Sequence, residues 1–548
     1  MKLSLSIIFK QALVIGLSSI SFGCGGSGSN TPLSTTTSVS GIVMAGPASG
    51  ASVNVKSTSG TVVAGPVTTG TDGSYTIVIP NASLSGDLIF EASGGTFPDE
   101  ATAATGVSMG TLTSHAGAGF LAAGSHVAID PSTTIIQKLI AGGKTKTAAE
   151  NAFAAAFGYT PDSSVKPAFA GMSSASTTLQ RLAGLRAAAF SQLTKDLGLL
   201  PAKQFELINA IAADLADNGA LDGSSTVAPI ILPTDLANRF SQALINFLMS
   251  SYNKSKLTPD KIGAPVFNKI ALTPSYKIEF IPGMPAAAMG KSTFKIKITD
   301  TSGSTPGPAE GLTNITLKPF MYMSSKSHST PTMDVTESST PGTYDCTVYY
   351  LMSTDMTSGI SMGVWEVKVM IGAESAIFYP YVNMNMGSTP LAKLSGIVDT
   401  SVSANPVYSD GIVGMTGLKE TRTWFLFNDG IAQEGMANTY TVRLFTATKE
   451  MMTNFPAVYN GKVLKNDSTV DWTVSSMKVE VSSDKTSWTP LTESGNGHWN
   501  ATGIAPDMNN NIYVKLTVNG LQKTTDATAV GAANGYQTFA IVSGIGMP

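Results

Sequence analysis

Two methionines and one histidine form the segment of this sequence best suited to metal chemistry. Met321, Met323 and His328 lie within one short stretch, and thioether sulfur and neutral imidazole are favourable Cu(I) ligands. Further methionines follow nearby, namely Met333, Met352, Met356, Met362, Met384 and Met386. Methionine is also an ordinary core residue, and Met321 and Met323 would face the same way on a strand. A copper site and core packing are both open interpretations.

Other catalytic chemistry finds little support. The histidines are scattered at positions 115, 126, 328 and 498 and form no H-x-x-x-H or H-E-x-x-H pattern, so a zinc hydrolase site is not expected. The string from Gly359 to Gly363 matches a nucleophile elbow, but it precedes an expected strand and lacks the strand–turn–helix context that this motif needs. We therefore predict no catalytic residues and no enzyme. The alternative is a hydrolase whose site lies in the helical region.

Two cysteines occur, Cys24 and Cys346, in segments that we assign to different parts of the protein. A structural disulfide between them is therefore not expected. Cys346 lies in a strand-like run from Tyr344 to Val348. It suits a buried small residue, with a metal or redox role as the alternative.

The N-terminus has the pattern of a secretory signal. Lys2 and Lys10 are the only charged residues before the apolar and small residues of 11–22, and Gly23 precedes Cys24. A basic start, a short apolar stretch and small residues before a cleavage point are typical of a signal peptide, here residues 1–23. The stretch is too short for a lasting transmembrane helix.

The Gly23-Cys24 pair, followed by the Gly/Ser-rich segment from Gly25 to Asn30, resembles the lipobox of bacterial lipoproteins. The resemblance implies cleavage before Cys24, lipidation of its thiol and attachment to a membrane through that lipid. The protein would then be exported and anchored to the bacterial cell envelope, at the outer membrane, in the periplasm or at the cell surface. Residues 24–38 would form a flexible tether. Ordinary cleavage nearby is the alternative.

Composition narrows the possible partners. The 548 residues carry a net charge of −3, and charged residues make up 13% of the chain. Without a basic surplus to neutralise phosphates, nucleic-acid binding is not expected. A low charge with many Gly, Ser and Thr residues suits exported β-modules, for which an envelope protein or a glycan would be the partner. Apart from copper, no cofactor is expected.

Hydrophobic periodicity divides the chain into four folded regions. Alternation such as that of Tyr75, Ile77 and Ile79 predicts strands over 39–125. Apolar residues at spacings of three and four predict an α-helical domain over 126–257. Its stripes run from Leu179 to Leu197, from Phe205 to Leu215 and from Leu236 to Leu248. Alternation returns over 265–390 and 394–548 and predicts two more β-sandwiches.

The first β-region carries a family resemblance. Gly41-Ile42-Val43, then the segment from Gly50 to Val53, then Asp72-Gly73-Ser74-Tyr75 resemble carboxypeptidase-regulatory-like β-sandwich modules. The resemblance implies a stalk or adaptor without catalysis.

The region from Phe294 to Ile371 resembles the YtkA/FixH-like family of exported β-sandwiches. The matching residues are Phe294–Asp300, Met321-Tyr322-Met323, His328–Pro331, Gly342-Thr343-Tyr344 and Gly363–Val367. The resemblance implies extracytoplasmic copper handling or oxidase assembly, and it makes Met321, Met323 and His328 the candidate metal ligands.

The last two regions also resemble each other. Each has an amphipathic strand, Phe294–Thr299 or Tyr440–Phe445, and each has a Gly-x-Trp string that ends at Trp365 or Trp499. Distant tandem copies of an Ig-like sandwich are expected.

The sequence as a whole predicts a multi-domain, mainly β protein. Ig-like or transthyretin-like β-sandwiches would flank an all-α helical domain inserted between them. The expected function is a binding or structural role, as a scaffold or adhesion-like protein at the cell envelope. A copper-handling lipoprotein is the second hypothesis.

Overall fold

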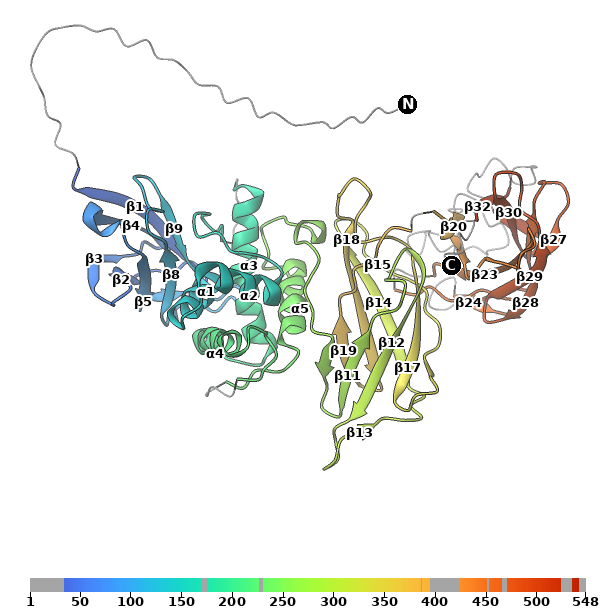
Figure 1. The fold of residues 1–548 in the computed structure, drawn as a ribbon, viewed down its shortest axis with the longest axis horizontal. Helices are drawn as coiled ribbons and strands as arrows, with labels where there is room; N and C mark the ends of the chain where they lie inside the picture. The colour runs from blue at the N-terminus through green and yellow to red at the C-terminus, as the bar shows by residue number, and fades with distance from the viewer. Residues whose placement is uncertain are drawn as a thin grey trace, which may run out of the picture.

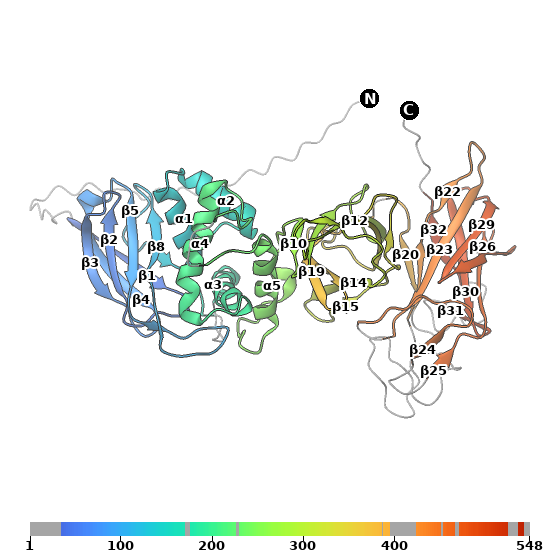
Figure 2. The same ribbon diagram turned by 90° about the horizontal axis from the view of Figure 1, so that it is seen from below.

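The computed structural model describes residues 34–169, 176–225, 230–385, 387–394, 423–450, 453–465, 471–523 and 535–541. Two perpendicular views show four structural units in a row, a β-sandwich, a group of helices and two further β-sandwiches (Figures 1 and 2). The signal peptide and Cys24 lie outside the described residues.

The first β-sandwich consists of two main sheets, with strand orders β4-β1-β9 and β3-β2-β5-β8, while β6 and β7 pair only with each other. Its strands are β1 Thr36–Val43, β2 Ser52–Ser57, β3 Val62–Thr68, β4 Ser74–Pro80, β5 Leu88–Ser93, β6 Thr96–Phe97, β7 Val107–Ser108, β8 Leu112–Ala116 and β9 His126–Ile129. In β4 the side chains of Tyr75, Ile77 and Ile79 are buried, as the alternation predicts. Because β1 begins at Thr36, the last three residues of the expected tether are strand residues.

Five α-helices follow the first sandwich. They are α1 Pro131–Ala141, α2 Lys146–Phe157, α3 Thr178–Asp196, α4 Gln204–Asp217 and α5 Leu236–Met249. Local chemistry sets their starts, because Asp130 and Thr133 form a capping box at α1, and Thr177 and Gln180 form one at α3. The apolar stripes fall on these helices as predicted, except that Leu179 is 66% exposed in the first turn of α3.

The first sandwich and the helices share one hydrophobic core. Phe97 meets Phe205 of α4 edge-on, with ring centroids 5.7 Å apart. Ser191 of α3 donates a hydrogen bond to Asp99 at 2.6 Å. The expected boundary at residues 125 and 126 is therefore wrong in two respects. His126–Ile129 is strand β9, which pairs with β1, and the two regions are not separate domains.

The third unit is a β-sandwich with strand orders β10-β11-β12-β17-β16 and β15-β14-β18-β19. Its strands are β10 Ile270–Leu272, β11 Tyr276–Ile281, β12 Gly290–Asp300, β13 Gly307–Pro308, β14 Ile315–Met323, β15 His328–Ser329, β16 Thr336–Glu337, β17 Thr343–Tyr350, β18 Gly363–Ile371 and β19 Glu374–Phe378. Phe294, Ile296 and Ile298 are buried while Lys295 and Lys297 are exposed, so β12 has one apolar face.

The fourth unit is a β-sandwich with strand orders β20-β21-β23-β29-β28 and β27-β26-β30-β31. Its strands are β20 Leu391–Leu394, β21 Trp424–Asn428, β22 Ala432–Gln433, β23 Tyr440–Thr448, β24 Val463–Lys465, β25 Asp471–Thr473, β26 Met477–Ser482, β27 Thr489–Pro490, β28 Thr492–Gly495, β29 His498–Ile504, β30 Asn511–Val518, β31 Leu521–Lys523 and β32 Gln537–Ala540. Since β20 pairs with β21, this unit begins at Leu391 rather than at residue 394.

The two C-terminal sandwiches have the same topology. The equivalent strands can be matched one to one in chain order. Those of the third unit are β10, β11, β12, β14, β15, β16, β17, β18 and β19, and their equivalents in the fourth unit are β20, β21, β23, β26, β27, β28, β29, β30 and β31. The two amphipathic strands of the sequence comparison, on β12 and β23, are equivalent. The two Gly-x-Trp strings are not, because Trp365 lies on β18 and Trp499 lies on β29, the equivalent of β17.

The chain is thus a multi-domain, mainly β protein with Ig-like sandwiches and one group of helices, as the sequence predicts. Among the described residues, none of the helices has the length and hydrophobicity needed to cross a bilayer.

Candidate functional site

The Met/His segment lies on β14, on β15 and in the loop between them. Met321 and His328 are cross-strand partners. Opposite residues of an antiparallel pair, and residues two apart on one strand, share a face of the sheet. Met321, Met323 and His328 therefore share the inward face of this sheet. Their depths differ, because Met321 is fully buried in the core whereas Met323 and His328 are half-buried.

Met323 and His328 line a cleft of about 340 Å³ between the third and fourth units. Met352, one of the further methionines named in the sequence analysis, lines the same cleft. The opposite wall, from the fourth unit, includes Phe425 and Phe455. The structure thus brings Met323, His328 and Met352 to one cavity and places Met321 in the core.

The charged residues that line this cleft are basic. Lys326, Lys393 and Lys449 line it, and none of its described lining residues is acidic. Burial lowers the pKa of His328, and the charges of Lys449 and Lys393 lower it further, although the hydrogen bond to Ser329 opposes them. His328 is therefore neutral near pH 7. Its Nδ1 lies 2.7 Å from the Ser329 carbonyl oxygen, so Nδ1 carries the proton and Nε2 can act as an acceptor or a ligand.

Other metal-binding sets are not evident in the described part of the chain, where no group of three or more His, Cys, Asp or Glu residues could hold an ion. Met386 lies outside the described residues. Cys346 is 1% exposed on β17, and burial raises its thiol pKa well above the ordinary range. This confirms its interpretation as a buried small residue.

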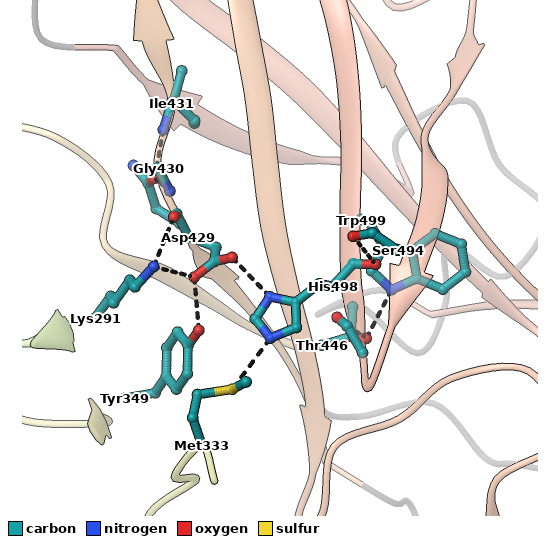
Figure 3. Close-up of polar contacts among 12 residues, drawn as sticks. Lys291, Met333, Tyr349, Asp429, Gly430, Ile431, Thr446, Ser494, His498 and Trp499 are labelled. Carbon is teal, nitrogen blue, oxygen red and sulfur yellow. Dashed lines mark hydrogen bonds and ion pairs between the residues drawn. The ribbon is translucent and has the colours of Figure 1, made fainter. Parts of the chain in front are cut away.

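A second polar cluster joins the same two sandwiches (Figure 3). Asp429, just after β21, receives hydrogen bonds from Tyr349 at 2.6 Å and from Lys291 at 2.8 Å. His498 Nδ1 lies 2.8 Å from the other carboxylate oxygen, and its Nε2 lies 3.2 Å from the sulfur of Met333. Lys291, Tyr349 and Met333 belong to the third unit, whereas Asp429 and His498 belong to the fourth.

Asp429 remains charged although its side chain is only 8% exposed. Burial alone would raise its pKa, but the hydrogen bonds from His498, Lys291 and Tyr349, together with the charge of Lys291, hold the pKa at about 2. Around this cluster the Tyr349 ring stacks on Phe445, with ring centroids 4.2 Å apart. The carboxylate is therefore a buried ionic centre within an apolar contact.

The Asp429–His498 pair resembles the acid–base part of a hydrolase triad but differs at the third position. In a triad the second ring nitrogen faces a nucleophilic hydroxyl or thiol. Here it faces the thioether of Met333. Ser494 instead donates its hydroxyl proton to the backbone carbonyl of His498. The arrangement holds two domains together, and it offers no nucleophile among the described residues.

The junction between the helices and the third unit uses amides instead of ions. Asn238 of α5 is 3% exposed, and its side-chain nitrogen donates to the carbonyl oxygens of Asn268, at 3.1 Å, and Ile377, at 2.8 Å. Its side-chain oxygen accepts from the backbone N–H of Asn268. Nearby, Tyr379 donates to Gln242 at 3.0 Å. The contacts of Asn238 are all neutral, whereas Tyr379 also interacts with the carboxylate of Glu366, whose pKa is raised by burial.

Comparisons with known proteins add little to these observations. No family model matches the chain, and no curated protein matches its sequence. Among solved structures, a marsupial T cell receptor is similar over 47% of this chain and 93% of its own, with 10% identity and a TM-score of 0.11. A group of titin domains is similar over 45% and 93%, with 7% identity and a TM-score of 0.12. At these TM-scores the likenesses carry no argument about function.

Sequence reasoning missed the Asp429 cluster altogether. Its members come from five separate segments, and none of them forms a motif with its neighbours in sequence. His498 drew attention only as an isolated histidine, and Met333 only as one of the methionines that follow the Met/His segment. A signal existed in Asp429 itself, since a charged residue there follows the apolar run from Trp424 to Phe427 after a single asparagine.

Proposed function

We propose that this chain is an exported bacterial lipoprotein, anchored through lipid on Cys24, that presents binding or structural modules at the cell envelope. In this proposal the protein acts as a scaffold or adhesion-like protein and is not an enzyme. Its partners are the membrane, through the lipid, and an envelope protein or glycan.

The observation that carries the proposal is the construction of the junctions. A chain of domains on flexible linkers would have small, polar interfaces. Here the first sandwich and the helices share a core, α5 is bonded to the third unit through Asn238, and Asp429 ties the third unit to the fourth. These contacts support an elongated and stiff body, which suits a protein that presents a surface at a distance from its anchor.

The position of the first strand fits the anchor. From Cys24 to Thr36, the first residue of β1, is a step of 36 − 24 = 12 residues. A chain of that length reaches at most about 40 Å. The body would therefore stay close to the bilayer at its first sandwich, with the fourth unit farthest away.

The test of anchoring uses the two cysteines of the chain. In the native bacterium, Cys24→Ser should abolish labelling by a palmitate analogue and release the protein from the membrane fraction. Cys346→Ala is the matched control, because it removes the other thiol from a buried position and should leave labelling and fractionation unchanged. Retention of the Cys24→Ser protein in the membrane fraction would refute the lipid anchor.

A copper-handling role is the second candidate, since Met323, His328 and Met352 share a cleft. The three lysines of the same cleft oppose a cation, so we rank it below the scaffold role. The test is Cu(I) titration of the full chain against a competing chelator. Combined Met323→Leu, His328→Asn and Met352→Leu substitutions should abolish stoichiometric binding, whereas Met321→Leu, in the core, should retain it. Equal binding by both variants would exclude this site.

A further inference from the structure

A groove of about 700 Å³ crosses the outer face of the sheet that contains β14 and β18. This is the face opposite to that of Met321, which points into the core of the third unit. Residues 453–457 of the fourth unit form one wall of the groove. Figure 1 shows β14 and β18 between the helices and the fourth unit. The volume lies within the usual range of ligand sites, which is about 300–1,000 Å³.

Antiparallel pairing of β14 with β18 places four side chains together on this outer face. Lys318 lies directly opposite Lys368, and Phe320 lies directly opposite Glu366. Residues two apart on one strand share a face, so these two pairs are neighbours. All four residues line the groove. Lys318 is exposed, while Lys368 and Phe320 are half-buried.

Lys318 and Lys368 form a cross-strand pair of like charge. Directly opposite side chains have Cβ atoms about 5 Å apart, and like charges in such positions destabilise the sheet. Among the described residues, neither lysine is held in an ion pair. An anion between the two ammonium groups would offset their repulsion. The first requirement on a ligand of this groove is therefore a negative charge.

The carboxylate of Glu366 does not supply that charge. It is 4% exposed and accepts a hydrogen bond from the Tyr322 hydroxyl at 3.3 Å. It also interacts with Tyr379, which packs with Ile245 of α5. Lys368 lowers the pKa of Glu366 through its charge alone. Glu366 thus belongs to the junction with the helices, and the part of the groove beside the two lysines keeps its positive charge.

The phenyl ring of Phe320 supplies an apolar surface beside the lysines. It follows Lys318 by two residues on β14, a step of about 7 Å along the strand. The ring of Tyr322 meets it in a T-shaped contact, with ring centroids 5.0 Å apart. A ligand that matches both features carries an anionic group on a ring with an apolar face.

We propose that this groove binds an acidic glycan whose repeating units are uronic acids. A carboxylate of the glycan lies between Lys318 and Lys368, and the C–H face of the same sugar ring lies on Phe320, since both surfaces are apolar. The hydroxyl side chains of Thr332 and Thr453 line the groove as well and suit the hydroxyls of the sugar. The inference names the glycan of the proposed function and rests on that function, but it does not depend on the lipid anchor.

The test is isothermal titration calorimetry on the purified full chain in detergent. The probes are oligogalacturonate and oligomannuronate, the matching neutral galactose and mannose oligomers, and oligoglutamate as an anion without sugar rings. We expect at least one oligouronate to bind about tenfold or more tightly than its neutral counterpart and than oligoglutamate. Absence of binding by both oligouronates would overturn the proposal. So would equal affinity for the neutral oligomer or for oligoglutamate.

Charge variants assign the binding to this groove. The double substitution Lys318→Gln and Lys368→Gln should weaken oligouronate binding about tenfold or more. It should not lower the melting temperature, because it removes a repulsion. Lys295→Gln with Lys297→Gln, at exposed positions of β12, makes the same change of charge in the same unit and should leave binding unchanged. Equal affinities in the two double variants would place the glycan elsewhere.

Ring variants test the contact with the sugar face. Phe320→Tyr keeps a flat ring and should retain the affinity, whereas Phe320→Leu keeps an apolar side chain without a ring and should weaken binding about fivefold. Equal affinity in these two variants would contradict the stacking of a sugar on Phe320.

The outcome is separable from that of the anchor. The Cys24→Ser chain should bind the oligouronate as the wild type does. Failure of glycan binding would leave membrane fractionation unaffected, and failure of anchoring would leave the calorimetric result unaffected.

Discussion

The third unit is joined to the helices on one side and to the fourth unit on the other, and the two junctions use different chemistry. At the helical side, Asn238 joins two backbones through neutral amide bonds. At the C-terminal side, Asp429 joins two sandwiches through a buried charge that Lys291, Tyr349 and His498 surround. An amide keeps its bonding pattern at every pH. A carboxylate does so only while it is ionised, so the bonds of Asp429 should depend on pH and those of Asn238 should not.

The largest expected effect comes from removing the buried charge. Asp429→Ala leaves Lys291 and His498 without their anionic partner in an apolar contact, which should cost about 3–5 kcal/mol. Urea denaturation of the full chain should show the loss in the transition of the fourth unit. Asp345→Ala, which breaks the exposed pair with Lys295 on the third unit, is the matched control and should cost at most about 1 kcal/mol. Equal losses would mean that Asp429 has no special role.

A smaller effect is expected at the amide junction. Asn238→Ala removes three hydrogen bonds and leaves buried backbone groups of Asn268 and Ile377 without partners, at a cost of about 2–3 kcal/mol. The measurement is again urea denaturation, and the loss should be the same at pH 7 and pH 3. Asn246→Ala, at an exposed position of the same helix, is the control and should have little effect. A loss that changes with pH would contradict the comparison.

In the wild type, acid should remove about 2 kcal/mol of the stability that Asp429 contributes to its junction, and it should leave the contribution of Asn238 unchanged. The pKa of Asp429 is lowered from 3.8 to about 2 in the folded chain. Because the pKa is lower in the folded chain, the carboxylate stabilises the fold fully at any pH above its pKa in the unfolded chain. This stabilisation disappears as the pH falls from about 4 to about 2. Small-angle scattering through this range should show the fourth unit moving relative to the third. In the Asp429→Asn variant this change should be absent, and its persistence would assign the transition to other groups.

Much of the fold could be predicted because it rests on local patterns. Alternation on β4 and β12, and apolar stripes on α4 and α5, lie within single elements and depend on near neighbours in the sequence. The tandem relationship of the last two units was also predicted, although the Gly-x-Trp strings were the wrong evidence for it. Both tryptophans are buried, but they occupy non-equivalent strands, so a common need for a large core residue produced the similarity.

The candidate sites were far less predictable, for a physical reason. Met323 and His328 are close in sequence and were found, but Met352 joins them only because the sheets of the sandwich stack. Met321 was selected by its spacing, and burial then placed it in the core. A single sequence contains none of these distances.

The common core of the first sandwich and the helices has a consequence for how this protein could have arisen. A segment that ended at Asp130 would leave an apolar sheet face uncovered, and the helices alone would lack the surface against which α1 and α4 lie. Residues 34–257 could therefore be transplanted to another protein only as one block. Recombination that preserved function would have to cut elsewhere, and the connection between the helices and the third unit is the nearest place where two complete cores meet.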